Sequence, residues 1–208
     1  MVTDNKPSLV TINVDGVEHQ VPAGANLVDA LGKIGKEVPH YCYHPKLPVA
    51  GNCRMCLVEL GSPMRDRATN ELVMENGLPK IGWQPKPAIA CATNVTPGLH
   101  VRLESPGVKA CREGVTEMLL LNHPLDCPIC DQAGECELQD YTFQEGRAAG
   151  RHDDYPKRYN PVEDFGPDVL YVPNRCILCT RCVRFMDDVA GDGVLNVSER
   201  GDRATIGI

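Results

Sequence analysis

The sequence has few aromatic residues and no long apolar run. Phe, Trp and Tyr make up 5% of the 208 residues, and one tryptophan is present. No stretch approaches the roughly 18 consecutive apolar residues that cross a membrane. The start, MVTDNKPSLV, has no apolar core of a signal peptide. We therefore expect neither a membrane span nor an export signal.

Positive charge is also scarce, since 21 Lys and Arg face 28 Asp and Glu, for a net charge of -7. This balance argues against general nucleic-acid binding and against docking on an anionic lipid surface. Neither glycine-rich nucleotide fingerprint, G-x-G-x-x-G or G-x-x-x-x-G-K-[ST], occurs. No carboxylate pair or nucleophile–base set suggests a catalytic site of the chain's own.

Cysteine, in contrast, is abundant, with eleven residues, most of them in C-x-x-C pairs. A secreted disulfide scaffold and an intracellular metal protein compete as explanations. The odd count, the missing signal peptide and the C-x-x-C spacing favour metal binding.

The N-terminal half predicts a small sheet with one helix across it. SLVTINVDGVEHQVP alternates apolar and polar residues around Asp15-Gly16, a hairpin signal, which predicts strands at 8–14 and 17–21. ANLVDALGKIG predicts a helix with Asn26 as its N-cap. LVELG, PAIACATNV and GLHVRLES supply further strands, and 62–87 is a polar insertion with a hairpin near ENGLPKIGWQP. This order is typical of a β-grasp fold.

The C-terminal half predicts short helices between cysteine loops. A helix over 107–122 carries apolar residues at helical spacing, namely Val108, Cys111, Val115, Met118 and Leu119. A second helix starts near Gly134, residues 146–170 form a linker or irregular segment, and VLYVPNRCILCTRCVRFMDDVAG predicts a short strand, a cysteine loop and a helix. The fold class is therefore α+β, with a β-grasp domain followed by small, loop-rich domains.

The first cysteine set consists of Cys42, Cys53, Cys56 and Cys91. One remote cysteine, a C-x-x-C pair and a distant fourth cysteine are the layout of plant-type [2Fe–2S] ferredoxins, with a longer first gap. A zinc ribbon is the alternative, but it usually has two C-x-x-C pairs. His40 and His44 flank Cys42, and we expect them to be exposed or to support the site rather than to bind metal.

The second set consists of His123, Cys127, Cys130 and Cys136. Pro124 and Pro128 stiffen the path from the histidine to the thiolates. A neutral imidazole can bind iron in place of a thiolate, which removes one negative charge from the site. Zinc with three cysteines and one histidine is the alternative.

The third set, Cys176, Cys179 and Cys182, opens like the [4Fe–4S] run C-x2-C-x2-C-x3-C-P. Met186 stands where the fourth cysteine is expected, and a thioether is a weak ligand for such a cluster. Cys111 lies on the apolar helix face, so we assign it to packing.

Together, PHYCYHPKLPVAGNCRMCLVE, NHPLDCPICDQAGECELQD and CILCTRCVRF resemble the N-terminal part of the G subunit of bacterial NADH-quinone oxidoreductase, respiratory complex I. The resemblance covers nearly the whole chain. It implies a [2Fe–2S] cluster on the first set, a histidine-ligated [4Fe–4S] cluster on the second, and three ligands of another [4Fe–4S] cluster on the third. The family's fourth ligand for that cluster comes from a later cysteine, so the chain is either part of a longer subunit or a naturally short one.

The resemblance further implies three domains: a [2Fe–2S] ferredoxin-type domain at 1–104, a [4Fe–4S] domain with one histidine and three cysteine ligands at 105–145, and a linker with a truncated [4Fe–4S] domain at 146–208. The implied function is to pass single electrons from a partner's FMN toward quinone. The implied partners are the FMN- and NADH-binding subunit, a small iron–sulfur subunit and connecting subunits, on the cytoplasmic side of the bacterial inner membrane.

Two alternatives remain at the sequence level. The same modules resemble the diaphorase subunit of NAD-linked hydrogenases, the N-terminal region of iron-only hydrogenases and components of NAD-dependent formate dehydrogenases. A zinc-stabilised interaction module belongs to another class of protein, and iron with acid-labile sulfide would distinguish an electron carrier from it.

Overall fold

The computed structural model describes residues 8–152 and 156–208. The chain divides into two compact units, which we name by their content. The sheet unit comprises residues 1–39 and 56–111, and the cysteine-rich unit comprises residues 40–55 and 112–208. No described helix is both long and apolar enough to span a bilayer.

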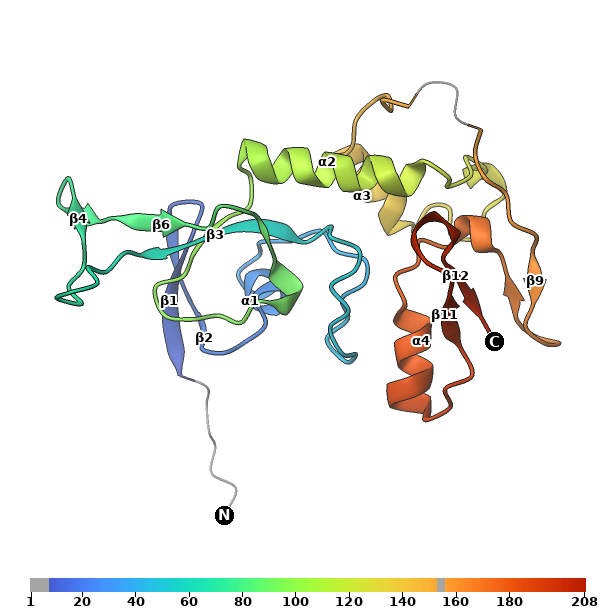
Figure 1. Cartoon of the computed structure of the whole chain (residues 1–208), viewed down its shortest axis with the longest axis horizontal. Helices are drawn as coiled ribbons and strands as arrows, with labels where there is room; N and C mark the ends of the chain where they lie inside the picture. The colour runs from blue at the N-terminus through green and yellow to red at the C-terminus, as the bar shows by residue number, and fades with distance from the viewer. Residues whose placement is uncertain (1–7, 153–155) are drawn as a thin grey trace, which may run out of the picture. The chain divides into compact units, whose positions relative to one another are not determined.

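The sheet unit contains most of the strands. Its elements in chain order are β1 (Leu9–Val14), β2 (Val17–Pro22), α1 (Leu27–Lys33), β3 (Leu57–Pro63), β4 (Met74–Glu75), β5 (Leu78–Pro79), β6 (Ile81–Trp83), β7 (Ala88–Ile89), the 3-10 turn η1 (Ala90–Ala92) and β8 (His100–Arg102). The main sheet has the strand order β2-β1-β8-β3-β6, and β7 also pairs with β3 (Figure 1). The pair β1 and β8 is parallel, while the other pairs are antiparallel.

The predicted hairpin at Asp15-Gly16 is confirmed. Both residues have positive φ, 49° and 89°, as a two-residue type I′ turn requires. The turn sets a register in which Val14 pairs with Val17 and Leu9 pairs with Pro22. This register points Ile12 and Val14 into the core, where both are fully buried.

The predicted cap of α1 is confirmed as well. The Asn26 side-chain oxygen accepts a hydrogen bond from the Val28 amide at 2.9 Å, which satisfies one of the free amides at the helix start. Leu27, Val28, Ala30 and Leu31 on this helix are buried. The helix therefore covers the sheet with an apolar face.

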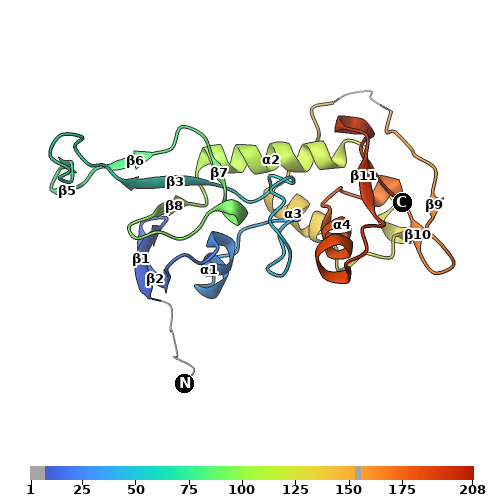
Figure 2. The same cartoon turned by 60° about the horizontal axis from the view of Figure 1, so that its bottom comes forward.

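The polar insertion forms the predicted hairpin, β4 and β5, joined by Asn76-Gly77. Figure 2 shows it extending past the end of β6. The segment PAIACATNV is less extended than expected: after the two residues of β7, Cys91 lies in the 3-10 turn η1. The Thr93 hydroxyl donates to the Ile89 carbonyl at 2.9 Å, which favours this turn over a continued strand.

Helix α2 (Pro106–Leu120) begins in the sheet unit and ends in the cysteine-rich unit. Ser105 caps it, since the Ser105 hydroxyl accepts from the Val108 amide at 3.1 Å. Val108 is buried as predicted, whereas Met118 is 78% exposed and does not belong to the apolar face. The reason is that Val115 and Leu119 already fill the packed side of this turn.

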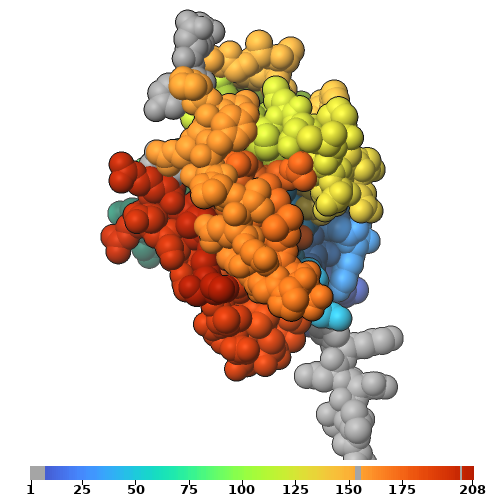
Figure 3. Space-filling model, turned by 90° about the vertical axis from the view of Figure 1, so that its right-hand side faces the viewer, coloured from blue at the N-terminus to red at the C-terminus, as the bar shows by residue number. Residues whose placement is uncertain are grey.

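The rest of the cysteine-rich unit consists of short elements between loops. They are the 3-10 turn η2 (Cys127–Ile129), α3 (Glu137–Glu145), β9 (Glu163–Asp164), β10 (Leu170–Tyr171), the 3-10 turn η3 (Pro173–Arg175), α4 (Arg181–Phe185), the π-helical turn η4 (Met186–Ala190), β11 (Asn196–Ser198), the 3-10 turn η5 (Gly201–Arg203) and β12 (Thr205–Gly207). Figure 3 shows the yellow segment around residues 120–145 beside the orange and red segment that follows residue 156.

Two predictions about this unit need correction. Helix α3 begins at Glu137 rather than near Gly134, because Gly134 has a φ of 88°, which no right-handed helix accommodates. The predicted linker at 146–170 contains β9, which pairs with β10. Residues 153–155 of that segment lie outside the described residues.

Candidate metal centres

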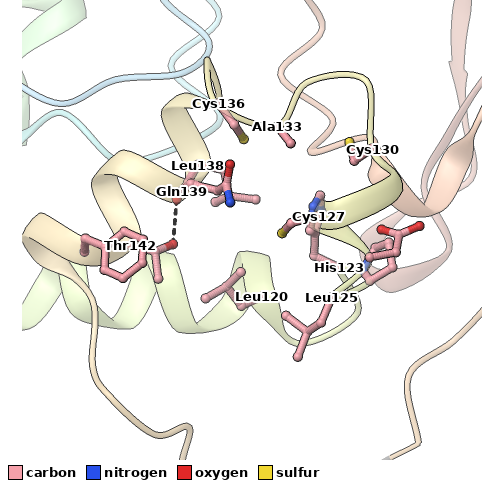
Figure 4. Close-up of a pocket in the computed structure, with 13 residues that line it drawn as sticks. Leu120, His123, Leu125, Cys127, Cys130, Ala133, Cys136, Leu138, Gln139 and Thr142 are labelled. Carbon is pink, nitrogen blue, oxygen red and sulfur yellow. Dashed lines mark hydrogen bonds between the residues drawn. The ribbon is translucent and has the colours of Figure 1, made fainter.

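The second predicted ligand set lines one cavity. His123, Cys127, Cys130 and Cys136 all border a space of about 230 Å³ within the cysteine-rich unit. Figure 4 shows the sulfur atoms of Cys127 and Cys136 directed toward the space between them. The structure therefore brings together the four donors that the sequence placed in one set.

Short turns deliver these four side chains. His123 follows the end of α2, Cys127 opens η2, and the Cys130 amide closes that turn on the Cys127 carbonyl at 3.2 Å. Cys136 occupies the N-cap position of α3. The left-handed Gly134 lets the chain reverse between Cys130 and Cys136.

An ion pair anchors the first turn of this site. The Arg175 guanidinium donates to the Asp126 carboxylate at 2.8 Å, and the pairing lowers the pKa of Asp126. The Ile129 amide donates to the Asp126 carbonyl at 2.9 Å. Asp126, the residue before Cys127, is therefore held from two directions, through its side chain and through its backbone.

The other walls of the cavity are largely apolar. They include Leu120, Leu125, Leu138 and Phe143. Thr142 also borders the cavity, but its hydroxyl donates to the Leu138 carbonyl at 2.6 Å (Figure 4). Apolar walls lower the local dielectric constant and strengthen the influence of each charge near the site.

Burial lowers the pKa of His123, and the nearby cations Lys157 and Arg175 act in the same direction. The Asp126 carboxylate opposes this shift. The net direction favours a neutral imidazole, the form with a free lone pair that binds a metal.

The geometry suits a multi-atom cluster. Within residues 8–152 and 156–208, no three His, Cys, Asp or Glu side chains converge to hold a single metal ion. The four side chains of the His123 set line one cavity, and an iron–sulfur cluster needs space between its protein ligands for its irons and sulfides. One imidazole and three thiols fit the donor chemistry of such a cluster.

The third set forms a tight loop. The Leu178 amide donates to the Cys176 sulfur at 3.3 Å, and Leu178 and Thr180 both have positive φ, 53° and 59°. Such left-handed residues are uncommon outside glycine, and they turn successive amides toward an anion or a sulfur cluster. Burial and the neighbouring thiols of Cys176 and Cys179 raise the pKa of Cys182.

The second and third sets lie close together, because Cys176 and His123 line a common cavity with Cys130 and Cys136. The third set still has a weak ligand at its fourth position. Met186, half-buried at the end of α4, offers a thioether where a fourth thiolate is expected.

The first set is divided between the two units. Cys42 and Cys53 belong to the cysteine-rich unit, where the Cys42 amide donates to the Cys53 sulfur at 3.5 Å. A hydrogen bond with the Cys42 thiol, followed by burial, raises the pKa of Cys53. Cys56 and Cys91 are fully buried in the sheet unit.

In the sheet unit, local contacts hold the second pair of this set. The Asn26 amide group donates to the Cys91 carbonyl at 2.7 Å, and the Ala90 amide donates to the Cys56 carbonyl at 2.9 Å. Asn26 thus serves both as the cap of α1 and as a support for Cys91. The grouping of all four cysteines remains a prediction from their spacing.

His40, His44 and Cys111, which we did not assign to metal, lie among protein neighbours. The His40 ring meets the edge of Tyr43 with centroids 5.6 Å apart, and His44 accepts from the Lys46 amide at 3.2 Å. Cys111 is half-buried on α2.

Sequence reasoning missed the side chains that pack between the ligand sets. Tyr41, Met55, Leu138 and Tyr141 form a small buried core, against which Cys53, Cys136 and Cys179 pack. It also missed Arg184, which donates to backbone carbonyls of two cysteines. The arginine within CVRF was visible in the sequence, but no spacing rule connects it to Cys42.

Family models match three successive parts of the chain. A 2Fe-2S iron–sulfur cluster binding domain matches residues 8–106. The NADH-ubiquinone oxidoreductase-G iron–sulfur binding region matches residues 112–151, and the ferredoxin-like domain of NADH-quinone oxidoreductase subunit 3 matches residues 166–208. The predicted fold class and the predicted cluster types are thereby confirmed.

Curated relatives match nearly the whole chain. The mitochondrial NADH-ubiquinone oxidoreductase 78 kDa subunit of Neurospora crassa is 45% identical over 99% of this chain and 25% of its own length. The G subunit of NADH-quinone oxidoreductase from Rickettsia felis is 41% identical over 95% of this chain and 26% of its own length. The chain thus spans about a quarter of the length of these relatives.

Among solved structures, an NAD+-reducing [NiFe]-hydrogenase in its H2-reduced state is similar. The superposition has a TM-score of 0.72 at 29% identity, and it covers 95% of this chain and 74% of the hydrogenase chain.

Proposed function

Because the chain belongs to the family of iron–sulfur subunits that includes the G subunit of NADH-quinone oxidoreductase, we propose that it relays single electrons in the NADH-oxidising arm of complex I. The electrons would come from FMN in a partner subunit and pass toward quinone. The convergence of His123 and three cysteines on one cavity is the observation that carries this proposal.

We assign one cluster to each ligand set. Cys42, Cys53, Cys56 and Cys91 would hold a [2Fe–2S] cluster, and His123, Cys127, Cys130 and Cys136 would hold a [4Fe–4S] cluster. Cys176, Cys179 and Cys182 would supply three ligands of a second [4Fe–4S] cluster. When bound, such clusters accept and release one electron at a time, while the protein sets position, potential and access of solvent.

The chain's own residues would tune these sites. The neutral His123 removes one negative charge that a fourth thiolate would bring, so it favours the reduced cluster. Leu120 and Leu138, which line the cavity, limit water around it. The backbone amides of Leu178 and Cys42, which donate to sulfur, stabilise thiolate charge in the other two sets.

The three domains that we propose, at 1–104, 105–145 and 146–208, agree approximately with the segments matched by the family models. As partners we propose the FMN- and NADH-binding subunit, a small iron–sulfur subunit and connecting subunits. A peripheral position on the cytoplasmic side of a bacterial inner membrane follows from the same assignment.

The solved hydrogenase structure supports a second candidate function. In an NAD-linked hydrogenase or formate dehydrogenase, the same electron relay would serve a different terminal reaction. We favour complex I because the curated relatives at 39–45% identity carry complex I names.

The test is to prepare the chain without oxygen, reconstitute it with iron and sulfide, and record metal content and EPR spectra. We expect iron, acid-labile sulfide, and separate [2Fe–2S] and [4Fe–4S] signals. A colourless protein that binds zinc and no iron would support the interaction-module alternative and refute the relay.

Single variants assign the signals to the sites. Cys53→Ala should abolish the [2Fe–2S] signal and keep the [4Fe–4S] signal. His123→Cys should keep a [4Fe–4S] cluster at a lower potential, because it exchanges a neutral ligand for an anionic one. An unchanged potential in His123→Cys would remove His123 from the site.

A further inference from the structure

Two cysteine loops of the cysteine-rich unit are tied to each other by side chains. One loop, residues 42–52, begins at Cys42. The other loop, residues 176–184, contains the third set. The Asn52 amide group donates to the Leu178 carbonyl at 3.1 Å, and Arg181 donates to the Tyr43 carbonyl at 2.7 Å. Figures 1 and 2 show α4, which ends the second loop, beside the first loop.

Arg184 makes the most extensive of these connections. Its Nη1 donates to the Pro48 carbonyl at 2.5 Å. Its Nη2 donates to the Cys42 carbonyl at 2.5 Å and to the Cys179 carbonyl at 3.2 Å. A single nitrogen therefore joins the backbones of two cysteines that belong to different ligand sets.

An arginine is suited to this place for two physical reasons. Its planar guanidinium offers five donors in a rigid fork, so it can bind several carbonyls at once. It is also permanently charged, and a cation close to an anionic iron–sulfur cluster favours the reduced form and raises the reduction potential. The carbonyls it binds belong to residues whose thiols are the proposed ligands.

On the basis of the proposed function, we propose that Arg184 is a positioning residue for electron transfer. It holds the Cys42 loop of the [2Fe–2S] site against the Cys176–Cys182 loop, and its charge raises the potential of the [2Fe–2S] cluster. It acts through the backbones of Cys42 and Cys179 rather than as a cluster ligand.

The experiment compares Arg184→Gln, Arg184→Lys and wild type in the full chain, reconstituted without oxygen. The readouts are iron and sulfide content, an EPR-monitored redox titration of the [2Fe–2S] signal, and amide hydrogen exchange of residues 42–52 and 176–184. The matched control is Arg203→Gln, the same loss of charge at an exposed arginine of the same unit.

Arg184→Gln should form the [2Fe–2S] cluster at normal yield with a lower potential. We expect the ratio of reduced to oxidised cluster at a fixed potential to fall roughly tenfold, which equals about 59 mV for a one-electron couple. Arg184→Lys keeps the charge and loses the fork, so its potential should stay near that of wild type while exchange rises in both loops together. Arg203→Gln should change neither readout.

An unchanged potential and unchanged exchange in Arg184→Gln would overturn the inference and leave the proposed relay intact. If Arg184→Gln gives no soluble protein, Arg184→Lys decides, because unchanged exchange in both loops overturns the connection. If the wild-type chain itself shows no [2Fe–2S] signal, the proposed function is overturned. A wild-type chain with that signal and an Arg184→Gln variant with unchanged readouts would overturn only the role of Arg184.

Discussion

The two units of the molecule are stabilised in different ways. Of the 25 buried hydrophobic side chains among the described residues, 18 lie in the sheet unit and 7 in the cysteine-rich unit. The sheet unit has a continuous strand ladder and an apolar helix, α1, whereas the cysteine-rich unit connects short turns around half-exposed thiols. From this difference we expect the sheet unit to fold on apolar burial and the cysteine-rich unit to depend on bound clusters.

Removal of iron should show the difference between the two units most clearly. In an iron-free chain, we expect the amides of residues 112–208 to exchange quickly, while those of β1, β3 and β8 stay protected. The reason is that metal binding supplies folding free energy where the apolar core is small. Hydrogen exchange with mass spectrometry measures both regions in one sample, and equal protection of the two units would contradict the expectation.

The next largest effect concerns the one ion pair with a fully buried arginine among the described residues. The Arg112 guanidinium, 2% exposed, donates to Glu145 at 2.9 Å and joins α2 to α3. Glu145→Ala should cost the cysteine-rich unit more than the roughly 1 kcal/mol of an exposed pair, because the buried guanidinium loses this carboxylate.

Denaturant unfolding of the reconstituted chain measures this cost. The control is Glu75→Ala, which removes the exposed pair with Lys80 in the sheet unit and should cost less than about 1 kcal/mol. A similar cost for both variants would show that the Arg112 pair carries no special role.

A truncation in the apolar core tests the stability of the sheet unit. Leu31 on α1 is fully buried, so Leu31→Ala should destabilise the sheet unit by about 2–5 kcal/mol. Leu78→Ala, at a side chain of β5 that is 71% exposed, should have little effect. Because Leu31 lies in the sheet unit, the EPR signal of the His123 site should survive the first substitution, and loss of that signal would show that the two units depend on each other.

The smallest expected effect is a pH dependence of stability in residues 147–152, the segment that follows α3. The Arg151 backbone amide and guanidinium donate to Glu117 at 2.6 Å and 2.8 Å, and they lower the pKa of Glu117 to about 2 from its usual 4.5. A lowered carboxyl pKa stabilises the folded state above pH 4.5, and this stabilisation is lost as the pH falls toward 2.

We expect the protection factors of amides 147–152, which correct for the slower intrinsic exchange in acid, to fall over that pH window more than those in β1. The change should be small because Arg151 is mostly exposed. Glu117→Gln should abolish the pH dependence, and persistence of the dependence in that variant would assign it to other groups.

Local stereochemistry made a large part of this molecule predictable. The Asp15-Gly16 turn and the Asn26 cap each depend on residues within a few positions of one another. The spacing of His123, Cys127, Cys130 and Cys136 also grouped these residues in one set, and all four line one cavity. Met118 was misplaced because a helical pattern shows which residues share a face and not which neighbours cover it.

The amino-acid sequence by itself was enough to predict the hairpin at Asp15-Gly16 and the Asn26 cap, because short-range geometry suffices for them. Only the tertiary structure decided that Cys42 and Cys53 belong to one unit and Cys56 and Cys91 to the other, and that Arg184 reaches the carbonyl of Cys42. Contacts between residues so distant in the chain depend on how loops pack, and no periodic pattern in the sequence records that packing.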